Sequence, residues 1–204
     1  MRNIYFIGGS PCSGKSTMAE IIAQKFNLHY FKVDDYIDEY TVKGAASGKS
    51  ICMKLKNMTP EQIWMRDPKN QSMEEIQFYQ EIFEFIIEDI NNITYQNGII
   101  TEGAAFLPCI MKNRDIDQKH YINITPSPEF QISHFRERPF VPYVLEGCSD
   151  KEKAFMKWMD RDILFAKAVR EQAMEMGYIT ILNDGTTSIE EMFKSICMHF
   201  DLVD

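Results

Sequence analysis

The chain has 204 residues, 45% of them hydrophobic, and a formal net charge of -8. This length favours one domain spanning residues 1–204, and the apolar fraction excludes a disordered chain. The acidic balance argues against a nucleic-acid-binding protein, because such proteins present basic surfaces. The sequence also has no run of about 20 apolar residues, the length that a membrane-spanning helix needs.

The five cysteines form no C-x-x-C pair and show no zinc-ligand spacing. A scattered, odd set of cysteines is typical of reduced thiols. No apolar signal segment precedes the first predicted strand. We therefore expect a cytoplasmic protein that binds neither nucleic acid nor membrane and is a monomer or a homodimer.

The predicted elements alternate between strands and helices along the chain. An apolar run over residues 3–7 predicts the first strand, and helical apolar spacing over 17–26 predicts the first helix. Four further strands are predicted over residues 29–33, 98–101, 120–124 and 178–182. Five strands separated by helices indicate an α/β fold in which a parallel sheet carries helices on both faces.

Capping residues mark the predicted helix starts, because their side chains accept hydrogen bonds from the first helical turn. Thr59 precedes a proline and stands three residues before a glutamine, and Ser127 also precedes a proline. Ser72, Ser149 and Ser188 each stand three residues before a glutamate. Each of these five residues is therefore predicted to begin a helix.

Two stretches lack a clear periodicity. Residues 41–58 contain two glycines and are read either as a mobile loop near a substrate or as a simple connection. A proline-rich, irregular loop runs to Gly147 and belongs to a predicted lid over about residues 136–149. A candidate substrate-binding segment covers about residues 36–71.

The run from Gly9 to Ser16 matches the phosphate-binding pattern G-x-x-x-x-G-K-[ST] and stands between a predicted strand and a predicted helix. Gly9 and Gly14 allow backbone N–H groups to point at an anion, and the helix N-terminus adds positive potential. In this pattern Lys15 reaches the β- and γ-phosphates, and the Ser16 hydroxyl binds Mg²⁺. The Cys12 thiol either fills a small space in the loop or, near these N–H groups and Lys15, has a lowered pKa and is open to oxidation. The candidate nucleotide-binding residues here are Gly9, Ser10, Pro11, Cys12, Ser13, Gly14, Lys15, Ser16 and Thr17.

Carboxylates follow two of the predicted strands, at the edge of a parallel sheet where ligands bind. Asp34 comes directly after the second strand, which suits a residue that accepts the proton of a substrate hydroxyl and orients its oxygen. Asp35 points to another side, where it would hold Mg²⁺ through water, contact the substrate or cap the next helix. Glu102 follows the third strand, where an acid binds Mg²⁺ directly or through water, or contacts the substrate. The alternative for each carboxylate is a purely structural role.

Arginines stand where a lid or a substrate site needs positive charge. Arg136 and Arg138 lie at the start of the proline-rich loop, and we expect them to stabilise a transferring phosphoryl group when the lid closes. Arg66, in the middle section, and Arg161, on a predicted helix, are candidates for substrate binding. The alternative for each arginine is a surface salt bridge, for example between Arg136 or Arg138 and Glu137.

The phosphate loop, the acids after the second and third strands and the arginine-bearing lid resemble, in this order, the P-loop kinases of small metabolites and nucleoside monophosphates. Residues 33–37 are similar to the pattern of antibiotic phosphotransferases. Asp34 matches the acceptor-binding or general-base aspartate of shikimate-, gluconate- and chloramphenicol-type kinases. The glycine motif that shikimate kinases keep after the third strand is absent, and Glu102-Gly103-Ala104-Ala105 stands there instead.

This resemblance implies a three-layer α/β/α fold, a five-stranded parallel sheet of order 2-3-1-4-5 and a lid. It also implies that the loop of Asn183, Asp184 and Gly185 wraps the adenine of ATP through backbone contacts. The middle section does not match the nucleoside monophosphate site of adenylate-type kinases, so the resemblance leaves the acceptor open.

The expected activity is the Mg²⁺-dependent transfer of the γ-phosphoryl group of ATP to a hydroxyl of a small metabolite. In this activity Lys15, Asp34, Arg136 and Arg138 would be catalytic. One alternative is a nucleoside monophosphate kinase, whose phosphate acceptor needs arginines but no general base. A second alternative, of another class, is an ATP-binding regulatory or assembly module with slow ATP hydrolysis.

Overall fold

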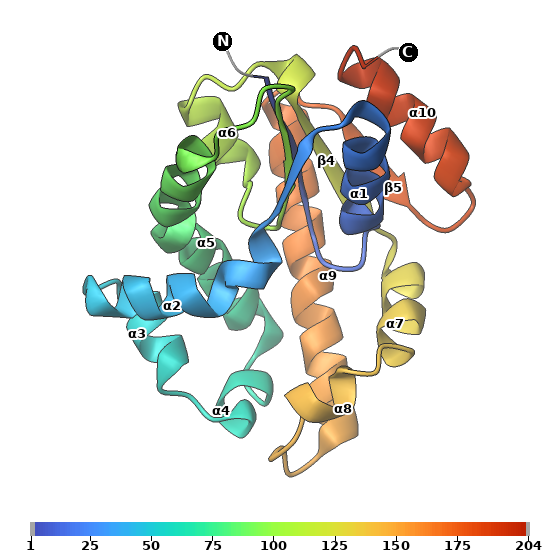
Figure 1. Ribbon diagram of the computed structural model, residues 1–204. Helices are drawn as coiled ribbons and strands as arrows, with labels where there is room; N and C mark the ends of the chain where they lie inside the picture. Colours follow the sequence, from blue (N-terminus) through green and yellow to red (C-terminus); the bar gives the residue numbers. More distant parts are fainter. Residues whose placement is uncertain (1–2, 203–204) are drawn as a thin grey trace.

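The computed structural model describes residues 3–202, which contain a sheet of five parallel strands (Figure 1). The strands are β1 (Ile4–Gly9), β2 (His29–Lys32), β3 (Ile99–Glu102), β4 (Tyr121–Pro126) and β5 (Thr180–Asn183). Their order across the sheet is β2-β3-β1-β4-β5, and each neighbouring pair is parallel. The predicted sheet and its order are therefore confirmed.

Helices cover both faces of this sheet (Figure 1). One face packs against α1 (Lys15–Phe26) and α10 (Ile189–His199), and the other packs against α5 (Pro68–Asn92), α6 (Pro108–Asn113) and α9 (Lys151–Glu175). Because successive strand residues point to opposite faces, Phe6 of β1 lies in the α5–α9 core, whereas Tyr5 and Ile7 lie in the α1–α10 core.

Two helical arms extend from the carboxyl edge of the sheet. The first arm, residues 37–67, contains α2 (Ile37–Ala46), α3 (Ser50–Lys56) and α4 (Pro60–Trp64), and it follows a 3₁₀ turn over Val33–Tyr36. The second arm, residues 128–149, contains α7 (Pro128–Arg136) and α8 (Val141–Val144). Figure 1 shows α4 and α8 at the same end of the molecule, near the lower end of α9. A short 3₁₀ turn over Gln118–His120 precedes β4.

The second arm has a small core of its own on α9. Phe135, Val141 and Leu145 are buried and pack with Phe155 and Trp158 of α9. The stretch that was expected to be irregular is therefore partly helical, because the short helix α8 places Val141 and Leu145 against α9.

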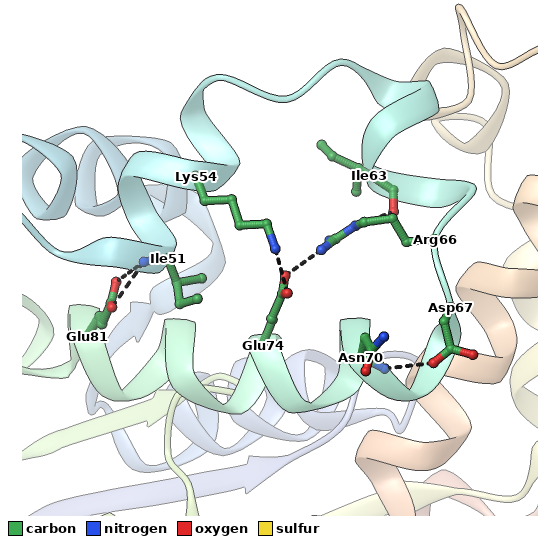
Figure 2. Close-up of polar contacts among 8 residues, drawn as sticks. All are labelled: Ile51, Lys54, Ile63, Arg66, Asp67, Asn70, Glu74 and Glu81. Carbon is green, nitrogen blue, oxygen red and sulfur yellow. Dashed lines mark hydrogen bonds and ion pairs between the residues drawn. The ribbon is translucent and has the colours of Figure 1, made fainter.

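The prediction that residues 41–58 are irregular was wrong, because they form most of α2 and all of α3. The two helices approach closely at Gly44, where a Cβ would lie 2.5 Å from the Cys52 Sγ. Glu81 of α5 holds the first turn of α3, since its carboxylate accepts hydrogen bonds from the N–H groups of Ile51 and Cys52 (Figure 2 draws the bonds to Ile51). This cap comes from a helix that is distant in sequence, so the local sequence does not predict it.

Two predicted helix starts were also misplaced. Helix α5 begins four residues before Ser72, at Pro68, and Asp67 caps it by accepting a hydrogen bond from the Asn70 N–H at 3.0 Å (Figure 2). Helix α9 is capped by Asp150 rather than Ser149.

The caps at Thr59, Ser127 and Ser188 are confirmed, each accepting from the backbone N–H three residues later. Within residues 3–202, no helix is both long and apolar enough to cross a bilayer.

Candidate active site

The phosphate loop leaves β1 at Gly9 and enters α1 at Lys15. Gly9 and Gly14 have φ values of +122° and +90°, which side-chain-bearing residues avoid. A Cβ on Gly9 would lie 1.8 Å from the carbonyl oxygen of Ile124, so glycine is required where β1 meets β4. Gly14 is the N-cap of α1 and offers no side chain to it, which leaves the first N–H groups of the helix available to an anion.

The side chain of Lys15 folds back over this loop. Its Nζ donates a hydrogen bond to the Ser10 carbonyl oxygen at 2.6 Å and to the Ser13 Oγ at 3.4 Å. Lys15, Ser10 and Ser13 are all buried, with Lys15 only 7% exposed. The ammonium group is thus held at the centre of the turn, where it adds to the positive potential of the backbone N–H groups.

Cys12 corrects one expectation about this loop. Burial raises the pKa of the Cys12 thiol, and the nearby Arg138 and Lys15 offset only part of that effect. The prediction of a lowered pKa was wrong because it considered the cations and left out the cost of desolvating a thiolate. Cys12 also adopts a left-handed backbone conformation with φ +62°.

Glu102 lies beneath the loop and is 1% exposed. Its Oε1 accepts hydrogen bonds from the Ser16 Oγ and the Tyr30 Oη, both at 3.0 Å. Its other oxygen, Oε2, is buried and accepts no hydrogen bond from the described residues. Burial raises the pKa of Glu102, and Lys15 works in the opposite direction.

A buried carboxylate oxygen without a partner, next to a hydroxyl, fits Mg²⁺. This ion prefers oxygen ligands and keeps several waters, so one or two protein ligands suffice when phosphates supply others. Residues 3–202 contain no group of three His, Cys, Asp or Glu side chains that could bind a metal by themselves. Ser16 and Glu102 are therefore the residues whose oxygen atoms fit the ion.

A cavity of about 870 Å³ opens beside the phosphate loop, between the two arms, α5 and α9. Lys15, Ser16 and Asp34 line it near the loop. Its more distant walls are apolar and aromatic, and they include Ile37, Leu55, Ile63, Trp64, Phe78 and Phe140. A cavity of this size, lined by both apolar and polar side chains, is typical of a small-molecule site.

The two aspartates after β2 have different surroundings. Asp34 lines the cavity together with Lys15, so its carboxylate and the phosphate loop face the same space. Asp35 instead forms an exposed ion pair with Lys32 at 3.6 Å and is not among the cavity residues. The structure thus brings Asp34, and not Asp35, to the phosphate loop.

The two arginines of the second arm also have different surroundings. Arg138 lines the cavity, and its Nη2 lies 3.7 Å from the Cys12 Sγ of the phosphate loop. Arg136 is exposed and donates to Glu152 of α9 at 3.1 Å, with its guanidinium over the Phe155 ring. Arg136 still belongs to α7, which directs it away from the cavity.

Arg161 of α9 lines the cavity and forms ion pairs with two carboxylates. Its Nε lies 2.6 Å from Asp162 Oδ1 and 3.2 Å from Glu75 Oε2, and its guanidinium stands 5.1 Å from the centre of the Trp64 ring. Glu75 and Asp162 are both buried. Burial raises the pKa of Glu75 to about 7 and that of Asp162 to about 6, although Arg161 acts to lower both. The cost of desolvating the two carboxylates outweighs the attraction of the one base that they share, so both acids hold a proton more tightly here than in water.

Arg66 lies in the same cavity but is also paired. Figure 2 shows the side chains of Arg66 and Lys54 converging on the carboxylate of Glu74. The Lys54 Nζ is 2.6 Å from Glu74 Oε1, and Arg66 contacts the other oxygen while its Nε donates to the Ile63 carbonyl oxygen. These contacts tie the first arm to α5.

The two arms are joined to each other directly and through the N-terminal half of α9. The carboxylate of Glu61 accepts hydrogen bonds from the Ser149 N–H and Oγ, both at 2.8 Å. Lys157 donates to the carbonyl oxygens of Met65 and Arg66, and the rings of Trp64 and Trp158 stack at 4.5 Å. The cavity is therefore bridged on this side.

Gln71 and Glu75 are cavity residues that the sequence analysis missed. They stand one helical turn apart on α5, in line with the buried Phe78 and Ile82. A glutamine and a glutamate within an apolar stripe of a helix are a signal that can be read from sequence. The predicted helix start at Ser72 leaves Gln71 outside that stripe.

A second cavity of about 530 Å³ lies on the other side of the phosphate loop. It is lined by Phe130 and His134 of α7, whose rings stack at 3.8 Å, and by the segment that follows β5. Asn183 donates from Nδ2 to the Ser13 carbonyl oxygen at 3.1 Å, which ties that segment to the phosphate loop. Gly185 lines the cavity with φ +84°.

Asp184 is exposed and accepts hydrogen bonds from the N–H and Oγ1 of Thr186, so it shapes the turn and does not line the second cavity. Cys12, Gly14, Thr17 and Arg138 line both cavities, so the phosphate loop separates a larger space from a smaller one.

No protein-family model matches the chain, and no curated protein matches it. Among solved structures, a shikimate kinase from Bacteroides thetaiotaomicron is similar at 17% identity and a TM-score of 0.53, over 99% of this chain and 98% of that one. A shikimate kinase from Acinetobacter baumannii in complex with shikimate is similar at 13% identity and a TM-score of 0.50, over 97% and 92% of the two chains. These likenesses show that the chain has the fold of P-loop small-molecule kinases, as the resemblance implied.

Proposed function

We propose that this protein is an ATP-dependent phosphotransferase that moves the γ-phosphoryl group of ATP to a hydroxyl of a small molecule. The observation that carries the proposal is that Lys15 of the phosphate loop and Asp34 line one cavity, which continues into an apolar space outside the loop. A kinase needs that arrangement, because donor phosphate and acceptor must meet in line.

In the proposed reaction, the acceptor oxygen attacks the γ-phosphorus. The bond to the β–γ bridging oxygen breaks, ADP leaves with that electron pair, and the acceptor's hydroxyl proton passes to Asp34. Lys15 and the loop N–H groups hold the phosphates, and Arg138 stabilises the charge on the transferring group. Arg136 would join only if the second arm rearranged, because it now pairs with Glu152.

The nucleotide base is proposed to lie in the second cavity. The Phe130–His134 pair offers an aromatic face, and the turn at Asn183, Asp184 and Gly185 offers backbone groups beside it. The phosphate loop, which lies between the two cavities, would then bind the chain of phosphates that extends from the base toward the acceptor. Mg²⁺, held by Ser16 and through water by Glu102, would neutralise phosphate charge when bound.

The other binding and location predictions stay predictions. Arg66 and Arg161 line the acceptor side of the cavity and are proposed to act there through the carboxylates they pair with. Asp35 has no proposed contact with the acceptor. Cytoplasmic location is proposed from the reduced-thiol pattern.

The test is a screen of hydroxyl-bearing metabolites and nucleosides for acceptor-dependent ADP release by the purified protein. An acceptor that is phosphorylated by the wild type and not by Lys15→Ala would support the proposal. Nucleoside monophosphates belong in the same screen, because phosphorylation of their phosphate, insensitive to Asp34→Asn, would favour a nucleoside monophosphate kinase instead. A protein that binds no Mg–nucleotide would refute the phosphotransferase altogether.

A further inference from the structure

The acceptor half of the large cavity is not built for an anion. Its two arginines are already neutralised by carboxylates of the protein itself. Arg161 faces both Glu75 and Asp162, so the group of three carries more acid than base. A site for a carboxylate or a phosphate monoester needs the opposite balance, with uncompensated positive charge that forms bidentate contacts.

The other charged residues of this half are balanced as well. Apart from Lys15 and Arg138, the four cationic cavity residues are matched in number by four acids: Lys32, Lys56, Arg66 and Arg161 stand with Asp34, Asp38, Glu74 and Glu75. Lys15 and Arg138 stand at the phosphate loop, where the phosphates of a nucleotide would occupy them. No cation of the described cavity residues is then left in excess for a negatively charged acceptor.

Two buried oxygen atoms in the wall lack donors. Gln71 is 3% exposed and its Oε1 accepts no hydrogen bond from the described residues, while its Nε2 donates to the Arg66 carbonyl oxygen. Glu75 is 8% exposed, and its Oε2 has an ion-pair contact with Arg161 but no hydrogen bond of good geometry. A buried acceptor atom without a donor costs about 1–3 kcal/mol, so a ligand that supplies an N–H or O–H is favoured here.

Much of the remaining wall is apolar. Leu55, Ile63, Trp64 and Phe78 surround the space into which Gln71 and Glu75 open. Such walls favour a ligand with a planar or apolar body and disfavour a fully hydroxylated one, whose hydroxyl groups would lose their water without replacement.

We propose that the phosphoryl acceptor is an uncharged or cationic alcohol with a planar or apolar body, and that Gln71 and Glu75 select it by accepting hydrogen bonds from its donor groups. Carboxylate and phosphate-monoester acceptors are disfavoured by Glu75, which lines the cavity. The inference rests on the proposed phosphotransferase function and specifies its substrate class.

Three probes of the same shape and different charge test the inference without knowledge of the natural acceptor. Benzylammonium, benzyl alcohol and benzoate are titrated by calorimetry into the full-length protein saturated with Mg²⁺ and a non-hydrolysable ATP analogue. The analogue keeps the probes away from the phosphate loop, and its own binding is measured first. Benzylammonium is expected to bind roughly fivefold to tenfold more tightly than benzoate, which is the effect of one partly buried charge contact.

Two variants assign that preference to residues. The titrations are run at pH 8, above the pKa of about 7 of Glu75, so that its carboxyl is ionised. Glu75→Gln keeps the size of the side chain and should reduce the preference for benzylammonium to about twofold or less, since one negative charge is removed. Gln71→Leu should weaken the binding of benzyl alcohol, because the hydroxyl of the probe loses a hydrogen-bond acceptor. Glu88→Gln, the same change at an exposed position of the same helix, should leave all three affinities unchanged. The ATP analogue must still bind each variant, which shows that the variant is folded.

The outcomes separate the two proposals. If the analogue binds and benzoate binds as tightly as benzylammonium or more tightly, or none of the probes binds, the substrate class is refuted and the phosphotransferase survives. If the analogue itself does not bind, both fail. A preference for benzylammonium that persists in Glu75→Gln would overturn the assignment to Glu75.

Discussion

Replacing Glu75 by glutamine should change how the stability of the protein depends on pH. Glu75 is packed against Arg161 and Asp162 of α9 and Tyr79 of its own helix, and burial raises its pKa from an ordinary 4.5 to about 7. A carboxyl that holds its proton more tightly in the folded state stabilises that state fully at pH values below 4.5. This contribution is lost as the pH rises through 7.

The size of the effect follows from the two pKa values. If the pKa of one carboxyl moves from 4.5 to about 7 on folding, the free energy of unfolding of the protein falls by at most about 3 kcal/mol between acid and alkaline pH. Asp162 shares Arg161 with Glu75 and its pKa is also raised, so part of this change belongs to the pair. For a chain of this length, about 3 kcal/mol corresponds to roughly 6–12 °C in Tm.

The assay is thermal and urea unfolding of wild type, Glu75→Gln and the exposed control Glu88→Gln at pH 5.5 and pH 8. Because glutamine cannot ionise, Glu75→Gln should gain stability over wild type at pH 8 and gain much less at pH 5.5, while Glu88→Gln should follow wild type at both. An unchanged difference between Glu75→Gln and wild type at the two pH values would show that Glu75 is not the buried acid that titrates.

Three other substitutions test the site and the core. With an acceptor found in the screen, Asp34→Asn should lower kcat by about 10²–10⁴-fold and leave the calorimetric affinity for Mg–ATP unchanged, as expected for loss of a general base; an equal loss of ATP affinity would contradict that role. Gly9→Ala should lower the free energy of unfolding by more than about 3 kcal/mol in urea, because its Cβ would lie 1.8 Å from a β4 carbonyl oxygen. The control Gly48→Ala has open space around it and should cost only the ~1–2 kcal/mol of a left-handed backbone. Ile196→Ala, at a fully buried position of α10, should cost about 2–5 kcal/mol, and a cost below 1 kcal/mol would argue against the α1–α10 core.

The parts of this fold that depend on local physics could be predicted from the sequence. The phosphate loop needs glycine at two left-handed positions, and those glycines stand at fixed spacing between an apolar strand and a helix. The caps at Thr59, Ser127 and Ser188 are also local, because each side chain bonds the backbone three residues later. The order of the strands came from the family resemblance.

The parts that depend on distant partners could not be predicted in the same way. Residues 41–58 look irregular because their own sequence carries no strong helix signal, and Glu81 of α5 supplies the cap that α3 lacks. Arg136 and Arg138 look equivalent in sequence, but only the position of Glu152 on α9 shows that Arg136 is engaged elsewhere. The charge state of Glu75 likewise depends on Arg161 and Asp162, which approach it only after folding.

The bridge between the two arms bears on the energetics of ligand binding. Glu61 with Ser149 connects the first arm directly to the second arm, which carries Arg138, and Lys157 of α9 ties the first arm to that helix through the carbonyl oxygens of residues 65 and 66. A displacement of Arg138 toward a triphosphate would be transmitted to the opposite wall, so occupancy of either half should alter the affinity of the other. Thermodynamic reciprocity requires both ligands to gain or lose by the same factor, and donor and acceptor would then bind as a cooperative pair.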